Sequence, residues 1–396
     1  MDILNDRWIP VVNKGEITRL SISEVQNIQV NNLGTGRFEL DFSILIMLIG
    51  LKKTGFIPDS LLSGNLRFLQ NKAAMEGSEK PIDQLLLGYP GANTIKNNKD
   101  FFIKRHTVKR ICPCCVIPAL YAKAQFSPGA GAGYYPGAMY HRINYLLEKK
   151  TIGETITANI VDESPVDSEI YFSVPNHYWL SDSTFGECDL CGNHGAVIES
   201  FFMKSTGISP NKIKTPHNSV SKAGKNHTLG RYALMYQIVN GVAPDGDVIS
   251  PIAIYENGEI GDDVIAFGTH YDKASLESCV MRRFKIRETV NKDILHKLFS
   301  LTFYCLEKRN AEMDDYNSTL FATLAAAYYE MLTDKNLDMS DAAIAVFDRY
   351  YTPSLDNPVI KQLDRWVKAR SELVIFSRMI RKKWRENNSV LLKNEK

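Results

Sequence analysis

Two short motifs, Cys112-Pro113-Cys114-Cys115 and Cys188-Asp189-Leu190-Cys191-Gly192, decide the fold of this chain. In each motif, two residues separate a pair of cysteines, and this spacing lets both thiolates converge on one tetrahedral ion. Gly192 leaves the backbone free to turn back after the second pair. The motifs therefore predict a closed, structural zinc site with the ligands Cys112, Cys115, Cys188 and Cys191. Because 72 residues separate the two pairs, the ion would tie together distant parts of one domain.

Other readings of these cysteines stay open at the level of sequence. Cys114 could take the place of Cys115, His194 could replace one thiolate, or the cysteines could be buried without a ligand. Cys279 and Cys305 lie in apolar surroundings and are expected to be simple core residues. An odd number of cysteines, seven in all, favours metal binding over a disulfide framework in a reducing compartment.

Length and composition indicate a globular protein with two domains. The chain has 396 residues, more than the roughly 250–300 at which a single hydrophobic core stops growing. Its longest apolar run, from Phe42 to Leu51, is about half of what a membrane span requires, so we expect a buried helix there and no membrane association. The first residues lack the basic start and apolar stretch of a signal peptide. We therefore expect a cytoplasmic protein.

The pattern of apolar residues predicts an α+β domain over residues 1–285 and a C-terminal four-helix bundle over residues 286–396. Helices are expected at 21–29, 40–53, 82–87 and 115–125, with Ser21 or Ser23 capping the first. Strand-like segments are expected at 8–12, 15–18, 160–174 and 195–203, and a hairpin at 249–267 that turns at Asn257-Gly258. After Lys273 the pattern becomes helical.

Positive charge is concentrated in three segments, although the formal net charge is only +2. No Asp or Glu occurs between Ser200 and Pro244, a stretch that contains Lys204 and other cations. The segments 96–123 and 365–385 are also rich in Lys and Arg. Such segments favour a surface that binds a polyanion, with ordinary solvated faces as the alternative.

A glycine-rich loop spans Ser127 to Tyr140 and follows the helix that starts at the first cysteine pair. Its small residues allow the backbone to approach a partner closely, and Tyr134 and Tyr135 offer flat rings. The minor groove of DNA is one partner that requires such close approach. A tight turn between two elements is the alternative.

No motif of a known catalytic site is present. The chain has no His-Glu-x-x-His helix, P-loop or serine elbow, and the glycine loop does not match a dinucleotide fingerprint. We therefore expect a protein that is not an enzyme. A zinc-associated nuclease of the HNH type is the alternative, with His194 or His217 as its base, and a pure scaffold that binds RNA and protein is a third possibility.

Four blocks in the same order resemble the large subunit of the type I-E CRISPR surveillance complex Cascade, the CasA family. They are residues 5–11 (Asn-Asp-Arg-Trp-Ile-Pro-Val), residues 81–93, the two cysteine pairs with the Pro-Gly-x-Gly-x-Gly loop from Pro128, and residues 265–275. The resemblance covers most of the chain and implies an N-terminal α+β domain with a zinc site and a C-terminal four-helix bundle.

The resemblance also implies a role in recognition. In such complexes the guide RNA reads the target sequence by base pairing, while protein reads a short adjacent motif, the PAM, in double-stranded DNA. It assigns this contact to the loop residues Gly129, Gly131 and Gly133 and to Lys204. It places the wedge that starts strand separation at Asp272 and Lys273, where a family member carries an Asn-Gln pair.

Partners follow from the same resemblance. Residues 93–110 correspond to the family's contact with the 5′ end of the guide RNA, through Lys96, Phe101, Phe102, Lys104 and Arg105. These cations suit phosphates, and the rings suit stacking on bases. The other implied partners are the backbone, small and 5′-end-capping Cascade subunits and the helicase-nuclease effector. The chain is shorter than typical members between Leu146 and Cys188 and after Ser205, near the surface implied for that effector.

Overall fold

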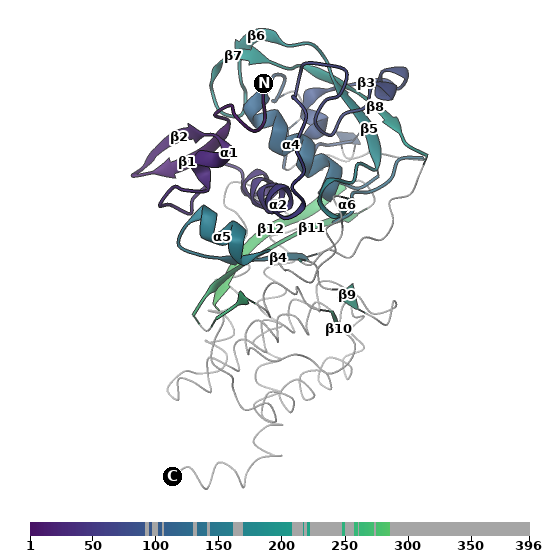
Figure 1. Cartoon of the computed structure of the whole chain (residues 1–396). Coiled ribbons are helices and arrows are strands. Elements are labelled where there is room, and N and C mark those ends of the chain that lie inside the picture. The colour runs from purple at the N-terminus through teal and green to yellow at the C-terminus, as the bar shows by residue number, and fades with distance from the viewer. Residues whose placement is uncertain are drawn as a thin grey trace, which may run out of the picture. The chain divides into compact units, whose positions relative to one another are not determined.

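A computed structural model describes most of the first 285 residues of the chain (Figure 1). The described residues are 1–91, 95–96, 102–104, 107–129, 133–140, 143–160, 169–207, 217, 220–221, 248–249, 257–259, 261–272 and 275–285. The chain divides into two compact units, one of Met1–Asn218 with Ser250–Arg283 and the other of Ser219–Ile249 with Phe284–Lys396. The expected helical bundle at 286–396 lies outside the described residues, and the domain boundary near residue 285 stays a prediction.

The described part of the chain mixes helices with antiparallel sheets, in agreement with the expected α+β class. The helices are α1 (Ile22–Val25), α2 (Phe38–Thr54), α4 (Pro113–Phe126), α5 (Ile152–Ala158) and α6 (Glu169–Phe172), with 3₁₀ helices η1 (Lys72–Glu76) and η2 (Ile82–Leu85). Ser21 caps α1, because its side chain accepts the backbone N–H of Glu24 and the Glu24 carboxylate accepts that of Ser21.

The strands form small antiparallel sheets. The strands are β1 (Ile9–Asn13), β2 (Glu16–Leu20), β3 (Ser78–Pro81), β4 (Ile143–Glu148), β5 (Asn176–Leu180), β6 (Thr184–Glu187), β7 (His194–Val197), β8 (Ser200–Ser205), β9 (Val220–Ser221), β10 (Val248–Ile249), β11 (Asp263–Asp272) and β12 (Ser275–Lys285). Two sheets have three strands, in the orders β12-β11-β4 and β3-β8-β5, while β1 pairs with β2 and β6 pairs with β7. In the second unit, β9 pairs with β10.

The core of the first unit is built on α2, as the apolar run at 42–51 predicted. Every residue from Phe42 to Leu51 is buried, so the helix is apolar all round and is covered on all sides. Phe42 of α2 stacks on Phe267 of β11 with ring centroids 4.6 Å apart, and Phe126 of α4 lies 5.0 Å from the same ring. These rings join α2 and α4 to the β12-β11-β4 sheet. In the described part of the chain, no helix is long and apolar enough to cross a membrane.

Three predicted segments differ from the structure. Within 160–174, which was expected to be strand-like, residues 169–172 form α6. The hairpin expected around Asn257-Gly258 does not form as predicted, since β11 starts at Asp263 and pairs with β4 and β12. The helical pattern expected after Lys273 is also wrong for the first residues, because β12 continues as a strand from Ser275 to Lys285.

Candidate metal centre and nucleic-acid interface

Two local structures present the four cysteines. Cys112 is the N-cap of α4, and Pro113 follows at the first helical position, where the missing N–H of proline costs nothing. The other pair lies in the turn between β6 and β7. There Gly192 has a φ of 68°, and its N–H donates to the Cys188 carbonyl at 2.8 Å. A left-handed conformation suits glycine, which explains why this residue ends the second motif.

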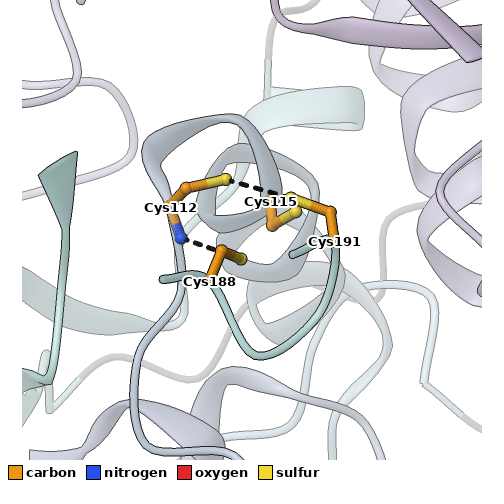
Figure 2. A group of neighbouring side chains, drawn as sticks. All are labelled: Cys112, Cys115, Cys188 and Cys191. Carbon is orange, nitrogen blue, oxygen red and sulfur yellow. Dashed lines mark hydrogen bonds between the residues drawn. The ribbon is translucent and has the colours of Figure 1, made fainter. Parts of the chain in front are cut away.

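The four side chains point toward one another in Figure 2. The sulfur atoms of Cys112, Cys115, Cys188 and Cys191 all lie within 4.8 Å of one another, and the Cys112 and Cys191 sulfurs are 3.7 Å apart. The backbone N–H of Cys112 also donates to the Cys188 sulfur at 3.2 Å. Together these cysteines could hold one metal ion. Cys114 is not part of this group, and among the described residues His194 instead lies 3.6 Å from the carboxylate of Glu187.

Charge in the cysteine group favours a bound cation. A contact with Cys112 lowers the pKa of Cys188, while the contact of Cys112 with Cys115 raises the pKa of Cys115. Sulfurs this close cannot all ionise without a positive charge between them, because neighbouring thiolates repel. The positive end of the α4 dipole stabilises the negatively charged thiolate forms of Cys112 and Cys115.

Hydrogen bonds of the Asp189 carboxylate and of the backbone hold the two halves of the cysteine group together. Asp189 accepts the N–H groups of Lys109 and Arg110 at 2.6 and 2.8 Å, and its own N–H donates to the Arg110 carbonyl at 2.9 Å. Ile111 and Ile198 exchange two backbone hydrogen bonds of 3.0 and 2.9 Å. The segment before α4 is therefore joined to the β6–β7 hairpin over several residues.

Arg19 lies beside the cysteine group although it is 172 residues from Cys191 in sequence. Its Nη2 donates to the Cys191 sulfur at 3.3 Å, from β2 of the N-terminal hairpin. Burial acts to lower the pKa of Arg19, but the combined charges of Cys114, Cys191, Cys112 and Cys115 outweigh it and raise the pKa. A guanidinium here offsets part of the negative charge that four thiolates carry around a divalent ion.

Replacing Arg19 with alanine is expected to weaken metal retention. Loss of an outer-shell donor typically costs about 10–100-fold in metal affinity. The measurement is the rate at which the zinc-loaded protein releases zinc to a chromogenic chelator. Arg7→Ala is the matched control, because Arg7 is paired with Glu24 and its removal should leave zinc release unchanged. Equal release rates for the two variants would rule out a role for Arg19 at the site.

The end of the glycine loop lies against the end of β8. Ser205 donates its hydroxyl to the Gly133 carbonyl, and the Tyr135 hydroxyl donates to the Gly207 carbonyl at 3.3 Å. The loop is also held from β5, where Asn176 Nδ2 donates to the Tyr135 carbonyl at 2.9 Å and Asn176 Oδ1 accepts the Tyr135 N–H at 3.3 Å. Gly133 therefore lies beside the residue that follows Lys204.

The glycines of this loop have specific backbone requirements. Gly133 has a φ of 84°, and a Cβ at Gly129 would stand 2.4 Å from the Tyr134 carbonyl oxygen. Gly131 is outside the described residues. The conformation of the loop itself therefore requires Gly129 and Gly133, as the alternative of a tight turn expects. Close approach of the loop to DNA stays a prediction.

The expected wedge begins close to the same loop. Asp272 is the last residue of β11, and its neighbour Tyr271 packs on Tyr140 at the end of the glycine loop, with ring centroids 5.5 Å apart. Lys273 is outside the described residues. The structure therefore brings Gly133 of this loop near the Lys204 segment and Tyr140 near the end of β11.

The expected guide-RNA segment is described only in part. Lys96 and Lys104 are exposed and Phe102 is half-buried, whereas Phe101 and Arg105 lie outside the described residues. Phe102 lies close to Gly88 together with Leu276 of β12, since a Cβ at Gly88 would come within 2.7 Å of Phe102 and 2.9 Å of Leu276. Ile103 is buried in the core and fixes this end of the segment.

The histidines considered for a nuclease differ in their surroundings. His217 is fully buried, its Nε2 lies 3.0 Å from the Tyr171 hydroxyl, and burial lowers its pKa to about 3. A histidine without access to solvent cannot reach a DNA phosphate. His194 is exposed on β7 and has the Glu187 carboxylate as its neighbour.

Comparison with known proteins finds one matching family model. The family model described as CRISPR-associated protein Cse1 matches residues 60–187. This segment of the chain is similar to the Cse1 family. No curated protein sequence matches the chain.

Solved structures share the fold of this chain at low sequence identity. A crystal structure of CasA from Thermus thermophilus is 12% identical, with a TM-score of 0.52 over 94% of this chain and 99% of that chain. A second structure of Thermus thermophilus CasA (Cse1) gives the same identity and TM-score over 97% of this chain and 95% of that chain. A chain of a pre-nicking CRISPR RNA-guided surveillance complex is 12% identical, with a TM-score of 0.57 over 94% of this chain and 98% of that chain.

The Cse1 match stops just before the second cysteine pair. It includes Cys112, Cys115 and the glycine loop, but Cys188, Cys191 and Lys204 follow it. Sequence reasoning did not find Arg19, Asn176 or Ser205, because their contacts join segments far apart in the chain. The only available signal was the position of Ser205 directly after Lys204.

Proposed function

We propose that this chain is the non-catalytic large subunit of a type I-E Cascade-like complex, and that it recognises the PAM in double-stranded DNA. The family assignment supports a role as the large subunit of a CRISPR surveillance complex. The proposal includes four specific roles. They are PAM reading, strand separation by the residues between β11 and β12, binding of the guide RNA 5′ end, and recruitment of the helicase-nuclease. The cytoplasm is its expected location.

The contact between Gly133 and Ser205 carries this proposal. This contact joins the glycine loop to the segment of Lys204. The Tyr140–Tyr271 contact joins the end of the loop to β11, whose last residue is Asp272. A narrow loop beside a cation suits a minor groove, whose floor carries acceptor atoms and whose rims carry phosphates. These two contacts between distant parts of the chain support the proposed DNA recognition.

We propose zinc as the ion of the cysteine group. Four thiolates without an open position are the usual ligands of a structural zinc ion. With Zn–S bonds of about 2.3 Å, tetrahedral geometry sets sulfurs about 3.8 Å apart. The 3.7 Å between Cys112 and Cys191 fits this spacing. Zinc bound here would hold the start of α4 on the β6–β7 hairpin and would supply no chemical step.

Replacing Lys204 with alanine tests the proposed DNA contact. Removal of one cation from the groove should weaken binding of a fluorescent mixed-sequence duplex about tenfold, since hydrogen bonds to charged groups contribute about 1.5–3 kcal/mol. The slope of log affinity against log salt should fall by about 0.9. Titrations at several salt concentrations measure both quantities. Lys14→Ala, in the turn between β1 and β2, is the control and should bind like the wild type.

The alternatives make different predictions in the same assays. A pure scaffold would bind guide RNA and the other subunits but not the duplex, so Lys204→Ala would change nothing. An HNH-type nuclease would cleave the duplex with magnesium and lose cleavage when the exposed His194 is replaced. Wild-type duplex binding without cleavage is the result that the proposal requires.

A further inference from the structure

Lys204 is paired with a carboxylate in the free protein. Its Nζ lies 2.6 Å from Glu76 Oε2, and the two side chains are 42% and 71% exposed. The pair is therefore at the surface, where a DNA duplex could reach both groups. The hydrogen bond from Lys204 also lowers the pKa of Glu76.

The backbone fixes Glu76 in this position. Glu76 ends η1, whose N-cap Asn71 accepts the Ala73 N–H at 2.9 Å with its side chain and donates its own N–H to the Tyr178 carbonyl at 2.9 Å. Gly77 follows, and a Cβ there would lie only 2.2 Å from the Met203 carbonyl oxygen. This close approach brings the end of η1 against β8 immediately before Lys204.

Strand pairing continues the same arrangement. Ser78 of β3 is paired with Met203 of β8, and Glu79 is paired with Phe202. The carboxylate of Glu76 is thus set beside Lys204 by the path of the main chain. Ser205, the next residue of β8, holds the Gly133 carbonyl, so the glycine loop contacts the strand one residue after Lys204.

The position of Glu76 has a consequence for DNA binding. A phosphate or base edge that approaches Lys204 must compete with Glu76 for its ammonium group. The carboxylate that is then left at the surface repels nearby phosphates. Both effects weaken binding to any duplex, and a duplex with the correct motif compensates through the contacts of the glycine loop.

We propose that Glu76 is a specificity-determining residue, which holds Lys204 and thereby suppresses binding to duplexes without a matching motif. This inference rests on the proposed DNA contact of Lys204. Glu76 is not among the residues that the sequence predicted to contact DNA.

Glu76→Gln, which keeps the shape of the side chain and removes its charge, provides the test. The variant should bind the mixed-sequence duplex about two- to fivefold tighter, the range that surface ion pairs usually span. In the Lys204→Ala background the same change should give a clearly smaller gain. Glu79→Gln is the matched control, because Glu79 is also on this face but accepts from Ser200 at 2.6 Å. In the assembled complex, selection from a pool randomised beside the target should return a broader set of motifs for Glu76→Gln.

Each result decides for or against the inference. Unchanged affinity for Glu76→Gln, a gain of the same size in the Lys204→Ala background, or an unchanged set of selected motifs would overturn it. If Lys204→Ala weakens binding while Glu76→Gln has no effect, only the role of Glu76 is wrong. If Lys204→Ala itself has no effect, the proposed DNA contact and this inference fail together.

Discussion

Replacing Cys188 with serine is expected to remove the metal and to abolish the cooperative folding of the first unit. Structural zinc sites contribute about 10–16 kcal/mol of apparent binding free energy, which is as large as the roughly 5–15 kcal/mol that stabilises a typical domain. Cys188 is buried within the cysteine group and accepts the Cys112 N–H, so serine would remove one of the four thiolate ligands. Metal content and thermal unfolding followed by circular dichroism measure the two effects.

Cys114→Ser is the matched control for this prediction. Cys114 lies in the same turn of α4 but is not part of the sulfur group. The control should keep one zinc ion per chain and melt close to the wild type. Metal loss in both variants, or in neither, would contradict the assignment of the four ligands. Treating the wild type with a strong chelator should reproduce the effect of Cys188→Ser.

Replacing Gly133 with valine should reduce target binding by the assembled complex to the level of non-specific DNA. Specific protein–DNA binding is typically about 10³–10⁷-fold tighter than non-specific binding, so the expected loss is large. Valine is strained at a φ of 84° and would displace the loop that Ser205 holds. Binding to targets with a pool of flanking motifs measures the effect, and complex assembly should remain intact. Gly131→Val should behave in the same way if the whole loop enters the groove.

Gly15→Val separates DNA recognition from backbone strain. Gly15 has a φ of 85°, and like Gly133 it has no atom within 4 Å of the position that a Cβ would take. Both substitutions therefore carry a similar intrinsic cost, but Gly15 lies in the turn between β1 and β2. The glycine-loop assignment would be wrong if the two variants lost target binding equally.

The sequence predicted the features whose signals are local. The spacing of the cysteines predicted a group that the structure brings together, and the apolar run at 42–51 predicted the buried helix α2. Ser21 was correctly expected at the start of α1, because a capping side chain acts within one turn. Each of these patterns is complete within a few residues.

The wrong predictions arose where distant contacts override a local pattern. Asn257-Gly258 resembles a hairpin turn, yet the Asn257 amide donates to the carbonyls of Ala158 and Ile160 at 2.9 and 3.2 Å, just after α5. The segment 275–285 becomes a strand because β11 lies beside it. The carbonyls bonded to Asn257 lie 99 and 97 residues away in sequence, and β11, although adjacent to β12, pairs on its other side with the distant β4.

The candidate site could be predicted in outline only. Resemblance to the CasA family selected the glycine loop and Lys204, but the hydrogen bonds that hold them together come from Ser205 and Asn176. The ion pair of Lys204 with Glu76 spans 128 residues. The ion pair forms only because η1 packs against β8, and no local sequence pattern predicts this packing.

The wide separation of the two cysteine pairs has a consequence for how the chain folds. Cys112 and Cys188 are 76 residues apart, and bringing them together costs loop-closure entropy before any contact compensates for it. An ion captured early by both pairs would close this loop in the unfolded chain. Refolding of the first unit should then become faster as free zinc rises, and reach a plateau once zinc binding precedes folding. Metal supply would in that case control how quickly new subunits become ready for assembly.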